Sequence, residues 1–125
     1  MAGPTMVVTR GRTSPFRIPV KDRAGTMYVL GDGEFLRFGV KRSTKDEEYL
    51  IYKEIREGTD GVYTLILKPE DTIYMEAGRY VYDVGLQSGD DYLDIIKTSA
   101  FTVSGNVTTP FMRDRIDEEE VAQNG

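Results

Sequence analysis

The alternation of apolar and polar residues with a period of two is the feature that most constrains how this chain folds. In one segment, Leu36, Phe38 and Val40 are separated by an arginine and a glycine. The same alternation recurs in residues 61–67 and 79–86. Because successive side chains of a strand point to opposite faces, these segments indicate β-strands with one buried face.

Eight segments predict strands, each short and rich in β-branched and aromatic residues. They are residues 6–10, 16–20, 27–30, 34–41, 50–54, 61–67, 79–86 and 94–103. Turn-forming residues separate them, and we expect Thr59-Asp60-Gly61 to join residues 50–55 to residues 62–67 as a hairpin. Residues 88–91 predict a second hairpin between the last two segments, and residues 70–76 must cross from one sheet to the other. This pattern is typical of a sandwich or a barrel.

A short motif favours the immunoglobulin-like form of sandwich. Glu76, Gly78 and Tyr80 stand where such sandwiches carry an acidic residue, a small residue and the tyrosine that opens the penultimate strand. In a tyrosine corner this hydroxyl bonds to backbone just upstream, which satisfies a buried phenol; the alternative is an ordinary half-buried strand tyrosine. We therefore predict an all-β, immunoglobulin-like antiparallel β-sandwich of about seven to eight strands with short N- and C-terminal extensions.

Charge is distributed unevenly along the chain, whose formal net charge is −5. Residues 1–25 hold five basic residues and one acidic residue, whereas residues 110–125 hold two basic and five acidic residues. We expect residues 1–108 to form the sandwich with its basic start, and residues 109–125 to form an acidic arm. These ends are either solvated termini or contacts between subunits, because complementary charge guides association. The predicted assembly contacts in them are Arg10, Arg12, Arg17, Phe111, Met112 and Ile116.

Composition excludes most catalytic chemistry. The chain has no cysteine and no histidine, which removes disulfides, thiolate nucleophiles, the Ser-His-Asp triad and nearly all catalytic zinc sites. Asp90, Asp91 and Asp94 lack the twelve-residue pattern of a calcium loop and favour a hairpin tip. The negative charge argues against nucleic acid, and no apolar run reaches the length of a membrane span. We expect no enzyme activity, no catalytic residue, no cofactor, no metal, and no nucleic-acid or membrane partner.

Eight tyrosines are more than the core of so small a sandwich can hold. Tyrosine offers apolar area and a hydroxyl with few rotatable bonds, so it is common at protein interfaces. The candidates for contact surfaces are Tyr49, Tyr52, Tyr74 and Tyr92. One alternative is that strand propensity alone accounts for them, and another is a platform for sugar rings, which the absence of tryptophan disfavours.

Read in order, these segments resemble small virion proteins of tailed phages, especially the immunoglobulin-like N-terminal domain of upper baseplate proteins from phages of Gram-positive bacteria. The resemblance covers about residues 6–108. It is carried by RGRTSPFRI at 10–18, LRFGVK at 36–41, YTLILKPEDT at 63–72, GRYVYDV at 78–84, and FTV followed by NVT at 101–108.

The resemblance implies a non-enzymatic structural component of a bacteriophage virion, assembled in the host cytoplasm through contacts with other virion proteins and with copies of itself. The chain departs from the longer family members in ending at Gly125, so we expect no receptor-binding head. A tail or baseplate accessory or adaptor protein fits this length, as does a capsid-surface decoration protein. The alternative outside assembly is a carbohydrate- or cell-surface-binding sandwich whose tyrosines contact a host-surface glycan.

Overall fold

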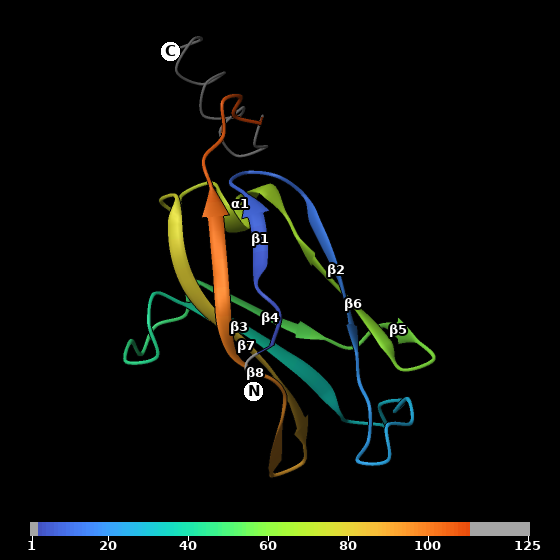
Figure 1. The fold of residues 1–125 in the computed structure, drawn as a ribbon. Helices are drawn as coiled ribbons and strands as arrows, with labels where there is room; N and C mark the ends of the chain where they lie inside the picture. Colours follow the sequence, from blue (N-terminus) through green and yellow to red (C-terminus); the bar gives the residue numbers. More distant parts are fainter. Residues whose placement is uncertain (1–2, 111–125) are drawn as a thin grey trace, which may run out of the picture.

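Two β-sheets pack face to face in the computed structural model, which describes residues 3–110 (Figure 1). Within these residues the five-stranded sheet has the order β1-β8-β7-β3-β4, and the three-stranded sheet has the order β2-β6-β5. The strands are β1 (Met6–Thr9), β2 (Ser14–Pro19), β3 (Phe35–Lys41), β4 (Ile51–Ile55), β5 (Gly58–Thr59), β6 (Val62–Leu67), β7 (Gly78–Ser88) and β8 (Asp91–Ser104). A single helical turn, α1 (Pro69–Thr72), lies between β6 and β7.

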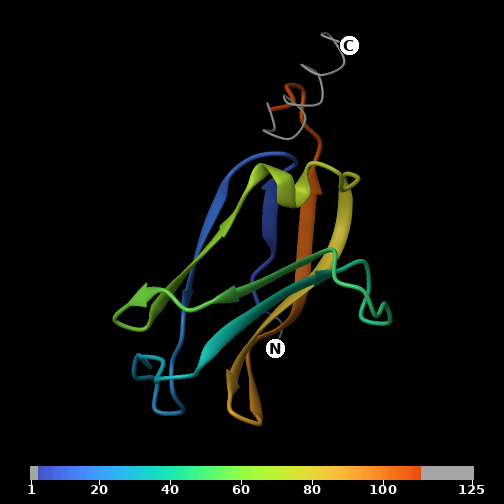
Figure 2. The same ribbon diagram turned by 180° about the vertical axis from the view of Figure 1, so that it is seen from behind.

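The architecture is an immunoglobulin-like β-sandwich, which confirms the predicted fold class. Neighbouring strands of the described residues pair in antiparallel fashion, except that β1 runs parallel to β8, with Met6 opposite Phe101. The view from behind shows the β7–β8 hairpin at the end of the molecule opposite α1 (Figure 2). The strands run from Met6 to Ser104, within the predicted sandwich of residues 1–108, and residues 111–125 of the predicted acidic arm lie outside the described residues.

The core forms where the alternating faces of the two sheets meet. Leu36, Phe38 and Val40 are fully buried, as their spacing predicts. The rings of Phe38, Tyr82 and Phe101 pack against one another with centroid separations of 5.9 Å, 6.3 Å and 6.4 Å. Tilted and edge-on aromatic pairs at these distances add to the free energy gained from apolar burial. The three rings come from the adjacent strands β3, β7 and β8, so they hold the centre of the five-stranded sheet together.

The turn at Thr59-Asp60-Gly61 forms a hairpin, but it joins β5 to β6 and leaves β4 in the other sheet. Asp60 and Gly61 have φ angles of 54° and 83°, and such positive angles at both residues are what a two-residue hairpin turn requires. β4 pairs with β3 and buries Ile51 and Ile55. The predicted pairing of residues 50–55 with residues 62–67 is therefore wrong, because turn chemistry is local whereas the choice of sheet depends on distant partners.

Residues 27–30 are predicted as a strand but lie in the loop between β2 and β3. Met27 makes an isolated bridge with Lys21, and the Val29 side chain is 65% exposed. The Asp22 carboxylate accepts hydrogen bonds from the backbone N–H groups two and four residues later, at 2.9 Å and 3.0 Å. These bonds turn the chain, so the apolar alternation of this segment has no sheet to join.

The crossover at residues 70–76 carries the chain from the three-stranded to the five-stranded sheet, as predicted. The Asp71 carboxylate accepts the Lys68 backbone N–H at 2.7 Å at the start of α1. The fully buried Thr72 hydroxyl accepts the Gly11 N–H at 2.8 Å, which ties α1 to the turn after β1. Among the described residues, no helix has the length and apolar character needed to cross a bilayer.

Candidate interaction surface

The tyrosine corner predicted from the sequence is present at the start of β7. The Tyr80 hydroxyl donates to the Glu76 carbonyl at 2.7 Å, and the Tyr80 side chain is only 3% exposed. Gly78 lies between them with a φ of +154°, a conformation that side-chain-bearing residues rarely adopt. The corner therefore has a structural role: it satisfies a buried phenol and fixes the end of the crossover.

Seven of the eight tyrosines divide into a buried and an exposed set, much as the sequence predicts, and Tyr28 is partly buried. Tyr63, Tyr80 and Tyr82 belong to the core. The four predicted contact residues are exposed: Tyr49 by 48%, Tyr52 by 36%, Tyr74 by 79% and Tyr92 by 45%. Large rings left this open to solvent are available for contact with another molecule.

Three of the four exposed tyrosines form one cluster with Arg37 on the outer face of the five-stranded sheet, Tyr52 and Tyr92 against the arginine and Tyr49 against Tyr52. The Tyr49 and Tyr52 ring centroids are 5.1 Å apart. The Arg37 guanidinium carbon lies 5.3 Å from the Tyr52 centroid and 5.6 Å from the Tyr92 centroid, within the range of cation–π attraction. We call Arg37, Tyr49, Tyr52 and Tyr92 the aromatic platform.

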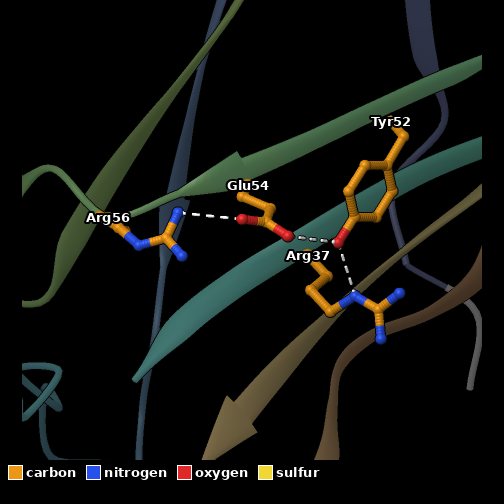
Figure 3. A network of polar contacts seen from close by, with 4 residues as sticks. All are labelled: Arg37, Tyr52, Glu54 and Arg56. Atoms are coloured by element: carbon orange, nitrogen blue, oxygen red, sulfur yellow. Dashed lines mark hydrogen bonds and ion pairs between the residues drawn. The ribbon is translucent and has the colours of Figure 1, made fainter. Parts of the chain in front are cut away.

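A chain of polar contacts fixes one side of the aromatic platform (Figure 3). Arg37 Nε donates to the Tyr52 hydroxyl at 2.7 Å, and this hydroxyl donates to Glu54 at 2.9 Å. Arg56 is the last member of this series of contacts and forms a 3.0 Å ion pair with the other Glu54 oxygen. The hydrogen bond from Tyr52, followed by that from Arg56, lowers the pKa of Glu54 below its ordinary value. Side chains held in place before binding lose less entropy when a partner arrives.

Two glycines leave room for platform rings to lie against the strand backbone. A Cβ at Gly39 would lie 2.9 Å from Tyr49 Cδ1, and a Cβ at Gly85 would lie 2.6 Å from Tyr92 Cε2. Both distances are shorter than real Cβ contacts, so each ring rests directly on the backbone. Glycine in a strand interior weakens the strand, and close approach of another group is a recognised reason for its presence.

A hollow of about 180 Å³ opens beside the Tyr49 ring on the same face. It is lined by Gly39, Lys41, Thr44, Tyr49, Val81, Tyr82, Asp83 and Thr98. Burial, followed by the neighbouring Asp94 carboxylate, raises the pKa of Asp83 above its ordinary value, while Lys41 and Arg37 oppose that rise. The Lys41 ammonium lies 4.8 Å from the Tyr49 centroid.

The remaining predicted contacts lie away from the aromatic platform. Arg10 donates to Asn106 Oδ1 at 2.9 Å and to the Met75 carbonyl at 3.4 Å, so it ties the end of β1 to the segments after α1 and β8. Tyr74 lines a separate hollow with Arg10 and Asn106. Arg12 is half-exposed and bonds to its own neighbouring carbonyl.

Arg17 is exposed on the outer face of the three-stranded sheet. The predicted contacts of the acidic arm, Phe111, Met112 and Ile116, lie outside the described residues.

Sequence reasoning missed four members of this surface: Arg37, Gly39, Asp83 and Gly85. All four occupy the polar face of correctly predicted strands, and β3 and β7 place Arg37 opposite Gly85 and Gly39 opposite Asp83. Two glycines inside strands otherwise rich in β-branched and aromatic residues were the available signal, because strand glycines mark close approach.

The side chains of this surface can stack on rings, exchange hydrogen bonds and pair with charged groups. Within residues 3–110, no group of three or more acidic side chains is placed to hold a metal ion. No model of a known protein family matches the chain, and no curated protein matches it. The function is therefore argued from the surface itself.

Proposed function

We propose that the chain is a non-enzymatic structural component of a bacteriophage virion and that it acts by binding another protein through the aromatic platform. The observation that carries this proposal is the preformed cluster of Tyr49, Tyr52 and Tyr92 around Arg37 on an open sheet face. Tyrosine and arginine are the residues that most often dominate protein–protein binding energy. The resemblance to phage baseplate domains supplies the virion context.

The side chains of the aromatic platform are held in place before any partner binds, which further supports the proposal of a protein partner. Arg37 is held by the Tyr52 hydroxyl at 2.7 Å, and Gln87 accepts from it at 3.4 Å. The strand glycines Gly39 and Gly85 seat the outer rings. A rigid, amphipathic surface of this kind suits a lasting assembly contact, because few rotors remain to be ordered on binding. Both a tail or baseplate adaptor and a capsid decoration protein would use it in this way.

A glycan-binding module is the second candidate, and the hollow beside Tyr49 favours it. The Tyr49 ring there stands beside a donor, Lys41, an acceptor, Asp83, and two threonines. A polyhydroxylated sugar ring needs an apolar face and convergent polar groups of both kinds.

Mass spectrometry of purified particles from the producing strain tests the first candidate. The chain should be present in particles at a reproducible ratio to the other virion proteins, and its absence from them would refute the proposal. A glycan array tests the second candidate. Retention of the wild-type protein, lost in Tyr49→Ala and kept in Tyr74→Ala, would replace assembly by sugar recognition.

A further inference from the structure

Two carboxylates, those of Asp83 and Asp94, lie beside the aromatic platform. Asp94 in β8 stands opposite Gly85, and Asp83 lies two residues before that glycine in β7. Among residues 3–110, neither carboxylate forms an ion pair within 4.0 Å or a side-chain hydrogen bond. The cations nearest to Asp83 are engaged with rings, Lys41 with Tyr49 and Arg37 with two other tyrosines.

Asp83 therefore offers a carboxylate in this hollow to one more cation. The Asp83 carboxylate is half-buried in it, and burial is the main reason that its pKa is raised. A carboxylate that has lost hydration without gaining a partner is stabilised when a guanidinium bonds to it. A guanidinium also stacks on tyrosine rings, which an ammonium does less well.

The opposite face of the sandwich offers such a group. Arg17 is the one charged residue of strands β2, β5 and β6. It is exposed, and among the described residues its side chain has neither a hydrogen bond nor an ion pair. Its neighbours on that outer face are Pro15, Pro19, Val62, Thr64 and Ile66. Among the side chains of these three strands Arg17 thus carries the single charge, with Thr64 opposite it and apolar residues on either side.

The outer face of this sheet, rather than its β2 edge, is the surface open to a partner. β2 lies at the edge of the three-stranded sheet, and Pro15 and Pro19 in it have no N–H to donate. An edge strand interrupted by prolines resists the addition of another strand. Ile66 on the neighbouring strand remains 43% exposed.

We propose that the protein binds a second copy of itself, with the three-stranded sheet of one copy packed on the five-stranded sheet of the next. Arg17 enters the hollow beside Asp83, and Pro15, Pro19 and Ile66 cover the tyrosines around it. This inference rests on the proposed function, because it names the partner of the aromatic platform. Two different faces meet, so the contact is heterologous and copies add in series into a ring or a filament.

Sedimentation velocity over a series of protein concentrations tests this contact. The wild-type protein should form dimers and larger species, and Arg17→Glu and Asp83→Asn should each weaken association by at least about tenfold. Arg23→Glu makes the same charge change in an exposed loop and should associate as the wild type does. Melting curves of each variant check that it is folded.

Mixing two variants gives the sharper test. Arg17→Glu keeps an intact five-stranded face, and Asp83→Asn keeps an intact three-stranded face. Each alone should associate weakly, but together they should form one-to-one complexes that do not grow, because the two faces left free carry an acid and a neutral amide and form no ion pair.

A wild-type protein that stays monomeric at every concentration tested would overturn the inference, as would association that Arg17→Glu leaves unchanged. Particle incorporation is measured separately and distinguishes this failure from failure of the proposed function. If Arg17→Glu and Asp83→Asn enter particles normally while loss of the platform tyrosines prevents entry, the platform binds a different virion protein and self-association is refuted.

Discussion

Gly85→Ala tests whether the aromatic platform needs the Tyr92 ring to rest on the backbone, because the substitution adds one methyl group where the ring lies. The new Cβ would lie 2.6 Å from Tyr92 Cε2, and closer still to Cζ and the hydroxyl. Ordinary carbon contacts begin near 3.5 Å, so the ring end must move by roughly 1 Å or more. The ring is 45% exposed and can swing into solvent, so the clash need not deform the sheet.

The two expected effects of Gly85→Ala on the free energy of unfolding nearly cancel. Moving the ring loses the cation–π contact with Arg37, which contributes about 0.5–1 kcal/mol at an exposed site. Replacing a strand glycine by alanine restricts the unfolded chain and gains about 0.4–1 kcal/mol. We therefore expect the free energy of unfolding to change by less than about 1 kcal/mol, while binding through the aromatic platform is lost.

Urea denaturation and particle incorporation measure these two effects of Gly85→Ala. Gly105→Ala is the matched control, since a Cβ there meets nothing within 4 Å. In a Tyr92→Ala background the glycine change should have no further effect on binding, because the obstructed ring is gone. Undiminished binding by Gly85→Ala would refute the reasoning, and so would destabilisation beyond about 3 kcal/mol, which would show that the ring cannot move.

Three further predictions concern stability. Tyr80→Phe removes the 2.7 Å bond to the exposed Glu76 and should cost about 1 kcal/mol in urea denaturation, whereas Tyr74→Phe should be neutral; equal effects would contradict the corner. Phe38→Ala opens a cavity in the aromatic core and should cost about 3–5 kcal/mol, and a loss below about 1 kcal/mol would contradict that core. The raised pKa of Asp83 means that the folded state holds this proton more tightly than the unfolded chain, so stability falls as pH rises from the ordinary aspartate pKa through the raised value. Asp83→Asn should therefore raise the melting temperature at pH 7 and lose this advantage near about pH 3, and a lower melting temperature at pH 7 would contradict the sign.

Local patterns predicted a large part of this fold. The alternation in residues 34–41 and 79–86 identified which side chains face the core, because strand geometry alone separates the two faces. The tyrosine corner was predictable because it too depends on local sequence: the hydroxyl of Tyr80 reaches a carbonyl only four residues away.

The parts that sequence reasoning missed depend on contacts between distant segments. Nothing within residues 50–55 shows that β4 joins β3 rather than β6. Tyr92 comes from β8 and Tyr49 from the segment before β4, and they reach the same outer face near Arg37 only because β7 and β3 are neighbours between β8 and β4. Four exposed tyrosines could be chosen from composition, but which three share a surface follows from strand order.

Quantitative mass spectrometry of particles made with the Tyr49→Ala/Tyr52→Ala/Tyr92→Ala variant is the most direct test that the protein works through the aromatic platform. The variant is supplied in place of the wild-type chain, beside Tyr74→Ala, which removes a still more exposed ring elsewhere. We predict that the triple variant is folded yet missing from particles, while Tyr74→Ala is present at the wild-type copy number. A triple variant found in particles at the wild-type copy number would contradict the account.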